Sequence, residues 1–266
     1  MSNYTIGFIG CGNMGGALIK AAAENTDAKK IAVYDTDAAK AEKLQDLYGV
    51  QSTALETLAN QAKIIVLGVK PQVMADALLP VKAILAQREN ALIITMAAGL
   101  SMQTVLGYIG KDLPIIRIMP NTPVSLGLGT VLYCTQGISK AAEEAFTKLF
   151  AKAGKLYPVT ETQLDAGGAL SGCGPAFVYA FVESLIDGAM ECGVSKADAE
   201  EWTVQTLLGA AQMLKTHGDP AALRKAVCSP GGTTLAGLAA MQEKGFHDAT
   251  KAAVAAAYKR TLELKN

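Results

Sequence analysis

Short apolar runs alternate with amphipathic, alanine-rich stretches along the first half of the chain. The runs are rich in isoleucine and valine and have the length of strands, whereas the stretches between them follow the period of helices. Because the runs are continuously apolar, the sheet they form is predicted to be parallel and covered on both faces. This pattern predicts a doubly wound α/β fold. Strands are expected at residues 5–10, 30–35, 62–71, 91–99, 114–123 and 129–134, and helices at 13–24 and 36–49.

The pattern changes at about residue 161, where strand-like runs stop. Four stretches have the composition of helices, and several are apolar on more than one face, at 174–193, 196–216, 219–227 and 233–265. A helix that is apolar all round must be buried from several sides, which one small helical domain does not achieve alone. We therefore predict two domains, 1–160 with the α/β sheet and 161–266 all-α, and a subunit interface on the second.

Composition narrows the class of protein. The 266 residues carry 24 basic and 24 acidic side chains, so no net charge attracts the chain to nucleic acid or anionic lipid. The five cysteines form no Cys-x-x-Cys pair, which is typical of a reduced, cytoplasmic protein, and no metal site is predicted. The first ten residues lack a secretory signal, and the longest apolar runs are strand-sized. We expect a cytoplasmic protein without nucleic-acid or membrane partners.

A glycine-rich turn follows the first predicted strand. Gly10, Gly12 and Gly15 form the pattern Gly-x-Gly-x-x-Gly, which opens a helix and begins a strand–helix–strand unit. In this context the first glycine makes the tight turn, the second lets the backbone approach a pyrophosphate, and the third lets the helix lie close to the strand. The helix N-terminus adds its positive dipole end. The turn predicts dinucleotide binding, with Cys11, Asn13 and Met14 as its remaining members.

The second predicted strand ends in Asp35, 20 residues after Gly15. A carboxylate at this position accepts hydrogen bonds from a ribose 2′-hydroxyl and repels a 2′-phosphate, which favours NADH over NADPH. The alternative is that Asp35 only caps the next helix. Lys40 and Lys43 lie one to two helical turns downstream, and no arginine is close by in the sequence.

Two further turns follow the third and fourth predicted strands. Ligands of open α/β sheets bind at the carboxyl ends of strands. Val69, Lys70 and Pro71 are therefore expected to meet cofactor phosphate or ribose, and the backbone of Ala97 and Ala98 to meet the nicotinamide side. The alternative for each segment is an ordinary turn at a strand end.

The chain lacks an obvious base for alcohol oxidation. Its two histidines, His217 and His247, lie in segments that are predicted to be helical and exposed, and neither follows a predicted strand. Reduction of a cyclic imine needs less assistance, because the ring nitrogen is protonated near neutral pH and hydride transfer neutralises the charge. Such an enzyme mainly positions the two reactants. The residues therefore favour imine reduction.

The stretch CSPGGTTLAG, residues 228–237, lies between two segments that have the composition of helices. One interpretation is a turn in which Thr233 or Thr234 caps the following helix. The other is a nest of backbone N–H groups that holds a substrate carboxylate, with the Thr234 hydroxyl within reach of a ring nitrogen. The residues alone leave both interpretations open.

Six motifs in order and spacing, GFIGCGNMG, VKPQ, AAGLS, RIMPNTP, ALSGCGPAF and SPGGTT, resemble those of the pyrroline-5-carboxylate reductase family. The resemblance covers nearly the whole chain. It implies an N-terminal Rossmann-type domain that binds NADPH or NADH, and a helical C-terminal domain that forms a homodimer, or a larger ring of dimers, by interleaving helices. The implied substrate is L-Δ1-pyrroline-5-carboxylate and the product is L-proline.

The resemblance also assigns residues. Ser229, Gly232, Thr233 and Thr234 are implied to hold substrate, with Thr234 as the catalytic hydroxyl, and Glu161 to lie near the substrate nitrogen. Open alternatives are a related imine or keto-acid reductase and a nucleotide sensor without catalysis.

The chain departs from the family pattern at three positions. Cys173 and Phe177 stand where the family commonly has serine and tyrosine, and Ala226 stands where some members have an asparagine that touches cofactor. Cys11 and Cys173 are interpreted as small residues and not as nucleophiles, because neither has a His or Lys in its local motif.

Overall fold

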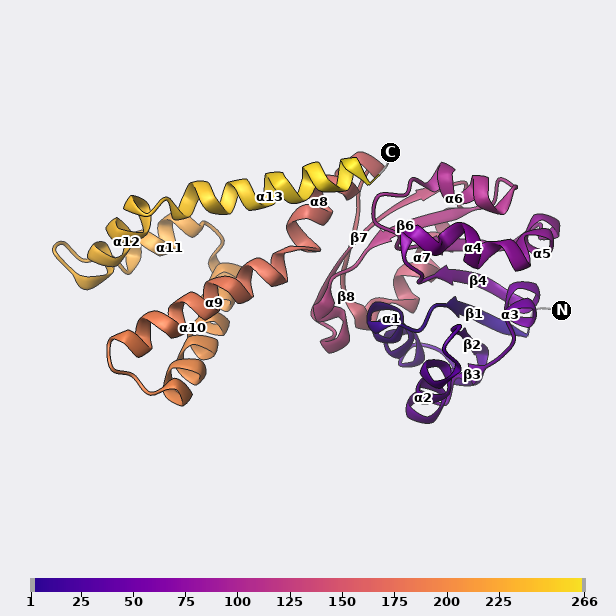
Figure 1. Cartoon of the computed structure of the whole chain (residues 1–266), viewed down its shortest axis with the longest axis horizontal. Coiled ribbons are helices and arrows are strands. Elements are labelled where there is room, and N and C mark those ends of the chain that lie inside the picture. Colours follow the sequence, from indigo (N-terminus) through magenta and orange to yellow (C-terminus); the bar gives the residue numbers. More distant parts are fainter. Residues whose placement is uncertain (1–2, 265–266) are drawn as a thin grey trace. The chain divides into compact units, whose positions relative to one another are not determined.

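One mixed sheet forms the centre of the first of two compact units in the computed structural model, which describes residues 3–264. The strands lie in the order β3-β2-β1-β4-β5-β6-β7-β8 (Figure 1). The strands from β3 across to β6 pair in parallel, as the continuous apolar runs predict. The bounds are β1 Tyr4–Ile9, β2 Ile31–Tyr34, β3 Gln51–Ser52, β4 Ala62–Leu67, β5 Leu92–Thr95, β6 Ile115–Met119, β7 Gly129–Gln136 and β8 Gly154–Pro158.

The last two strands correct the expectation of an all-parallel sheet. β7 runs antiparallel to β6, and β8 is parallel to β7. A parallel crossover needs about a dozen residues or more, and the connection 120–128, which contains a 3₁₀ turn at Thr122–Leu126, is too short for one. β3 and β8 were not predicted, since β3 has only two residues and the edge strand β8 is a polar, half-exposed segment, GKLYP.

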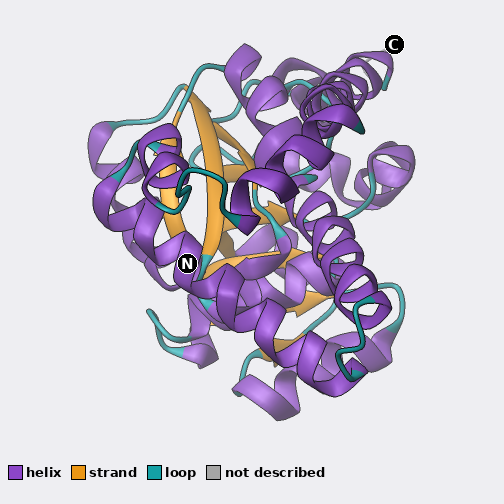
Figure 2. Ribbon diagram, turned by 90° about the vertical axis from the view of Figure 1, so that its left-hand side faces the viewer, coloured by secondary structure: helices purple, strands orange, loops and turns teal. Residues whose placement is uncertain are grey.

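Helices cover both faces of the sheet, which confirms the doubly wound α/β fold (Figure 2). One face packs buried side chains of α1, α2 and α7 against the strands. The other face packs α3, α4, α5, α6 and α8. The bounds are α1 Asn13–Ala23, α2 Ala38–Tyr48, α3 Leu55–Gln61, α4 Met74–Leu78, α5 Lys82–Gln87, α6 Met102–Ile109, α7 Lys140–Leu149 and α8 Glu161–Ser171.

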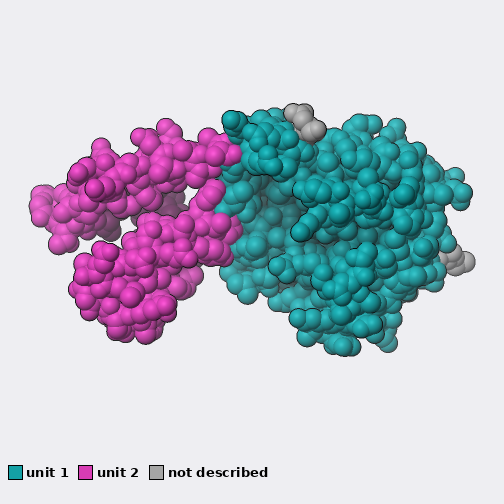
Figure 3. Space-filling view, in the orientation of Figure 1, with its two compact units in different colours: residues 1–173, 257–266 teal, residues 174–256 magenta. Residues whose placement is uncertain are grey.

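The first compact unit extends past residue 160. It comprises residues 1–173 and 257–266, and the second unit is 174–256 (Figure 3). The reason lies in α8, which packs on β6 and β7 and buries Leu164 and Asp165 there. Within one chain α8 therefore belongs with the sheet, and the domain boundary expected at 160/161 stays a prediction.

The second unit is helical throughout, as the sequence predicts. The stretch 233–265 contains two helices, because Gly245 at φ +74° interrupts it. α9 and α10 pack against each other, and the remaining helices follow along the chain. The bounds are α9 Gly174–Glu191, α10 Lys196–His217, α11 Pro220–Ala226, α12 Thr233–Glu243 and α13 Phe246–Glu263, of which the residues from 257 on belong to the first unit.

Apolar side chains of the second unit lie on its surface. Ala199 is the one buried apolar residue among its described positions, whereas Trp202, Leu208 and Met213 are about half exposed or more. Exposed apolar surface on this scale marks an interaction site. An 18-residue window within the segment 161–191 has a mean hydropathy of 1.4, so by length and composition alone the segment could cross a membrane. Only strand-sized apolar runs are visible there in the sequence, because polar residues such as Asp165, Ser171 and Glu183 interrupt the segment.

Candidate active site

The glycine-rich turn joins β1 to α1 in the geometry that its motif predicts. Gly10 has φ +104°, and an added Cβ there would lie 2.7 Å from the backbone of Gly68. A Cβ on Gly15 would collide with the carbonyl oxygen of Gly10. Neither position accepts a side chain, so the helix lies directly against the strand end.

Gly12 is different, because the space in front of it is open. It is the N-cap residue of α1 and no side chain caps that helix. An added Cβ would meet no atom within 4 Å. The first N–H groups of a helix have no intrahelical partner and attract anions. The open, uncapped helix start therefore fits a dinucleotide pyrophosphate.

Gly68 belongs to this turn and was missed by sequence reasoning. Its N–H donates to the carbonyl oxygen of Ile9 at 2.7 Å. An added Cβ would lie 2.9 Å from the carbonyl oxygen of Gly10. The available signal was a glycine that follows the apolar residues IIVL inside the third predicted strand, 62–71.

Asp35 ties the glycine-rich turn to the start of α2. Its Oδ2 accepts from the N–H of Cys11 at 2.7 Å, and its Oδ1 accepts from the N–H of Asp37 at 2.9 Å. The N-cap residue of α2 is Asp37, so Asp35 does not cap that helix. The carboxylate lies at the carboxyl end of β2, where the sequence placed it.

Two hollows flank the turn. The first, of about 140 Å³, has apolar walls and contains the carboxylates of Asp35 and Asp76. Its size and lining suit part of an adenosine. The second, of about 490 Å³, runs from Cys11–Asn13 to three lysines. These lysines are Lys20, Lys40 and Lys43.

One of the three lysines is already paired. Lys40 forms an ion pair with Asp37 at 3.4 Å, and both side chains are about half exposed. Lys20 donates to the carbonyl oxygen of Ser125 at 3.0 Å. The second hollow, beside the start of α1, is therefore lined by positively charged side chains, whereas the first hollow contains two carboxylates.

The remaining expected cofactor residues lie at strand ends of the same unit. Val69 lines the first hollow, and Lys70 is the exposed N-cap of a 3₁₀ turn that starts at Pro71. Ala97 and Ala98 lie in the loop after β5, whose first turn is held by a bond of 3.4 Å from the Ala97 N–H to the Thr95 hydroxyl. Met14 is half-buried against the core.

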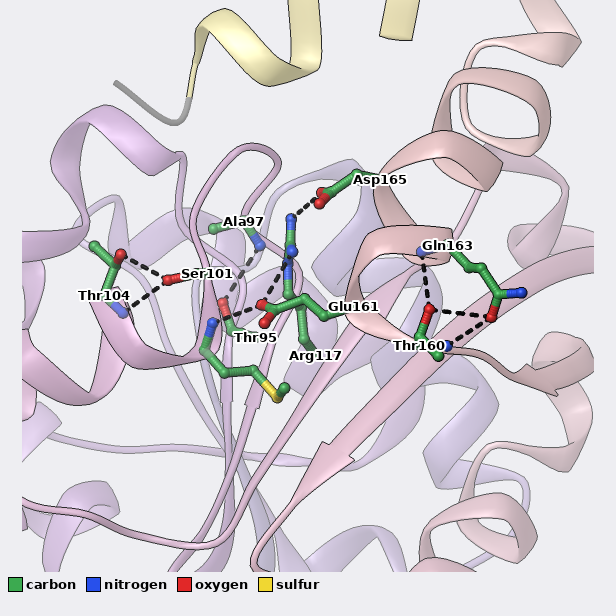
Figure 4. A network of polar contacts seen from close by, with 10 residues as sticks. Thr95, Ala97, Ser101, Thr104, Arg117, Thr160, Glu161, Gln163 and Asp165 are labelled. Carbon is green, nitrogen blue, oxygen red and sulfur yellow. Dashed lines mark hydrogen bonds and ion pairs between the residues drawn. The ribbon is translucent and has the colours of Figure 1, made fainter.

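Glu161 lies at the start of α8, in a charged cluster (Figure 4). Its Oε1 accepts from Arg117 Nη1 at 3.2 Å and from the backbone N–H of Met102 at 2.8 Å. Arg117 Nη2 also donates to Asp165 Oδ1 at 2.7 Å. Arg117 and Asp165 are 0% and 1% exposed, whereas the side chain of Glu161 is 33% exposed. Sequence reasoning missed Arg117 and Asp165, although a lone arginine inside the apolar run PIIRIMP was a visible signal.

The stretch CSPGGTT forms the start of α12 in the second unit. Gly231 has φ +69°, and the N–H of Gly232 donates to the carbonyl oxygen of Ser229 at 3.0 Å. Gly232 is the N-cap residue and no side chain caps the helix. Thr233 and Thr234 are the first two helical residues. The interpretation of either threonine as the cap is therefore wrong.

Cys11, in the glycine-rich turn, has no activating environment. Burial, with a further contribution from the carboxylate of Asp35, raises the pKa of the Cys11 thiol to about 12. Its thiol stays protonated at neutral pH and is a poor nucleophile. Cys173 is half-buried and free. This supports the interpretation of Cys11 as a small residue.

The fold and the turn define a class, the dinucleotide-dependent oxidoreductases with a Rossmann-type first unit. Residues 5–99 match the family model described as NADP oxidoreductase, coenzyme F420-dependent. Residues 161–264 match the model described as pyrroline-5-carboxylate reductase dimerisation.

Full-length relatives identify the family. The chain is 38% identical to the pyrroline-5-carboxylate reductase of Synechocystis over 97% of both chains. It is 37% identical to that of Pseudomonas aeruginosa over 99% of this chain and 98% of the relative. The chain belongs to the pyrroline-5-carboxylate reductase family.

Solved structures agree with this assignment. A pyrroline-5-carboxylate reductase from Coxiella burnetii superposes with a TM-score of 0.89 and 30% identity over 100% of both chains. The pyrroline carboxylate reductase of Plasmodium falciparum, solved with NADP bound, also gives a TM-score of 0.89, at 29% identity over the whole of both chains.

Proposed function

We propose that the chain reduces L-Δ1-pyrroline-5-carboxylate to L-proline with NADPH or NADH, the final step of proline synthesis. The observation that carries this proposal is the likeness to reductases of that name, at 38% identity over 97% of both chains in the first case. The open glycine-rich turn supports it, since the fold retains room for the cofactor.

The first unit holds the cofactor, whose reduced nicotinamide supplies the hydride when bound. The start of α1, with Gly10, Cys11, Gly12, Asn13, Met14 and Gly15, receives the pyrophosphate. The first hollow, with Asp35, receives adenosine. Val69, Lys70 and Pro71 border the phosphates and ribose, and Ala97 and Ala98 border the nicotinamide.

The second unit supplies the substrate contacts. The uncapped start of α12 offers the N–H groups of Thr233 and Thr234 to the substrate carboxylate, with Ser229 and Gly232 shaping the turn. The Thr234 hydroxyl hydrogen-bonds the ring nitrogen. Glu161, a residue of the first unit, is the further residue that we assign to this substrate. The imine arrives with its nitrogen protonated, so hydride addition to the ring carbon yields the neutral secondary amine without an enzyme acid.

A direct assay separates this function from its alternatives. The purified protein is mixed with NADPH or NADH and pyrroline-5-carboxylate, its six-membered homologue, or a 2-keto acid with ammonia. We expect cofactor oxidation fastest with the five-membered imine. Faster turnover of another substrate would indicate a related imine or keto-acid reductase, and cofactor binding without any turnover would indicate a nucleotide sensor.

The second unit also forms a homodimer, and a ring of dimers builds on it. This assembly covers the apolar surface of the second unit, including residues 174–191 of the candidate membrane span, with a second copy of the chain and not with lipid. We also propose a cytoplasmic location, since the free cysteines are typical of a reducing compartment.

Leu208→Glu tests the assembly. Leu208 is 60% exposed in the single chain and lies on α10. A charge there is expected to dissociate the dimer, because burying an unpaired carboxylate is strongly unfavourable. The matched control is Leu79→Glu, since Leu79 in the first unit is 70% exposed and lies outside the expected interface. Light scattering that finds a folded, active monomer of the unmodified protein at micromolar concentration would contradict the proposed assembly.

Asp35→Ser tests cofactor choice. Removing the carboxylate is expected to improve NADPH relative to NADH by about tenfold, the effect of one polar contact or one like-charge clash. Asp35→Asn is the matched control, because it removes the charge and keeps an oxygen that accepts from the N–H of Cys11 or Asp37. The readout is the ratio of kcat/KM for the two cofactors. If neither variant changes this ratio, Asp35 only holds the backbone of the glycine-rich turn and does not select the cofactor.

A further inference from the structure

The charged cluster at the start of α8 links the loop after β5 to the sheet. The loop leaves β5 at Thr95 and enters α6 at Met102. At its far end, the N–H of Met102 donates to Glu161 Oε1 at 2.8 Å. At its near end, the Thr95 hydroxyl accepts from the N–H of Ala97, and Thr95 lies beside Arg117 in the register of β5 and β6. The loop is therefore held at both ends.

Arg117 fixes the position of Glu161. Its guanidinium is completely buried and donates to carboxylates one helical turn apart on α8, Glu161 and Asp165. A buried ion pair is a poor source of stability, since apolar residues of similar volume are often as good or better. The contribution of the cluster is therefore to position the Glu161 side chain. It sets where the Glu161 carboxylate meets the N–H of Met102.

The loop that is held in this way lies where the cofactor's reactive end is expected. It follows the carboxyl end of β5, and ligands of open α/β sheets bind at such ends. Its residues Ala97 and Ala98 are those assigned to the nicotinamide under the proposed function. A shift of this backbone would displace the ring that carries the hydride, whereas the adenosine hollow lies at the ends of β1, β2 and β4.

We propose that Arg117 and Asp165 are positioning residues that act through Glu161 and the N–H of Met102 to hold the loop after β5 against the nicotinamide. This inference rests on the proposed function. It gives Glu161 a role through Oε1 that is separate from any contact with the substrate nitrogen. All four residues lie in the first unit, so the device is complete within one chain.

Met102→Pro removes the linking hydrogen bond with little change to the backbone. Met102 is the first residue of α6, a position that favours proline because its N–H has no intrahelical partner. Ser101 before it is extended, at φ −73° and ψ 160°, as a residue before proline prefers. Met102→Ala is the matched control, since it loses the same buried side chain and keeps the N–H donor.

The readout is calorimetric affinity for NADH and for ADP-ribose, which lacks only the nicotinamide. Relative to Met102→Ala, Met102→Pro is expected to weaken NADH by about tenfold, the effect of losing a hydrogen bond to a charged acceptor. Binding of ADP-ribose is expected to stay unchanged. Equal weakening of both ligands, or of neither, would overturn the proposal.

A second variant covers the case in which Met102→Pro does not fold. Glu161→Gln keeps the shape and one acceptor oxygen but loses the charge that pairs with Arg117. It is expected to weaken NADH in the same direction, by a smaller factor, and again to spare ADP-ribose. Unchanged NADH affinity in this variant would also overturn the proposal. Turnover of pyrroline-5-carboxylate by the unmodified enzyme tests the proposed function separately, since neither binding measurement involves that substrate.

Discussion

Thr234→Ala is expected to lower kcat/KM for pyrroline-5-carboxylate by roughly ten- to a hundredfold. The lost hydroxyl contacts the ring nitrogen in the proposed complex, and that contact strengthens as hydride arrives. The loss falls short of abolition, because the imine already carries its proton. The KM for the nucleotide is expected to stay nearly constant, since the glycine-rich turn lies in the other unit.

The position of Thr234 in α12 determines the stability expected for this variant. Thr234 is the second residue of α12, and the N-cap residue is Gly232 without a side-chain cap. Loss of a true cap costs about 1 kcal/mol of stability, so Thr234→Ala is expected to melt close to the unmodified protein. Thr234→Ser keeps the hydroxyl and is expected to keep most of the rate. An alanine variant that melts lower and turns over normally would reduce this stretch to a structural turn.

Gly12→Ala is expected to weaken NADPH and NADH binding by roughly ten- to a hundredfold, the effect of losing one charge-assisted hydrogen bond. An added methyl group meets no protein atom within 4 Å, so the fold tolerates it. Gly12 has φ −66° and ψ −175°, an extended conformation that alanine adopts readily. The methyl group occupies instead the space through which the pyrophosphate approaches the start of α1.

Gly107→Ala is the matched control for Gly12→Ala. Gly107 lies in α6, and an added Cβ there also meets nothing within 4 Å. It is expected to bind both cofactors normally and to be slightly more stable, because alanine favours helix. Calorimetric titration of both variants checks the prediction. Normal cofactor affinity in Gly12→Ala would show that the pyrophosphate does not pass this glycine.

Most of the fold could be predicted from the sequence, because the strands are continuous apolar runs and the second half has the composition of helices. It did not predict the direction of β7, which depends on the length of one loop and not on the residues of the strand. It missed β8, whose polar edge position removes the apolar signal. The ranges 62–71, 91–99 and 114–123 were too long, because apolar and small residues continue into the loops after Leu67, Thr95 and Met119.

The site was predictable where a local motif carries the geometry. Gly15 is required by its contact with Gly10 and Gly10 by its positive φ, both of which are local to one turn, so their spacing is enough to identify them. Gly68 and Arg117 depend on neighbours far along the chain, namely Gly10 for the first and the α8 carboxylates for the second. Residues that meet from such distant parts of the chain form no motif with a fixed spacing, so the sequence does not reveal the pair. The buried arginine was visible as an anomaly, and only the fold shows its partners.

Cofactor deuterated at the transferring position of the nicotinamide shows whether the enzyme delivers hydride to the imine carbon of pyrroline-5-carboxylate. The unmodified protein is incubated with this cofactor and pyrroline-5-carboxylate, and the product is analysed by mass spectrometry and NMR. We predict L-proline that carries one deuterium, on the ring carbon next to nitrogen that was the imine carbon. Cofactor oxidation without labelled proline, or no oxidation at all, would contradict it.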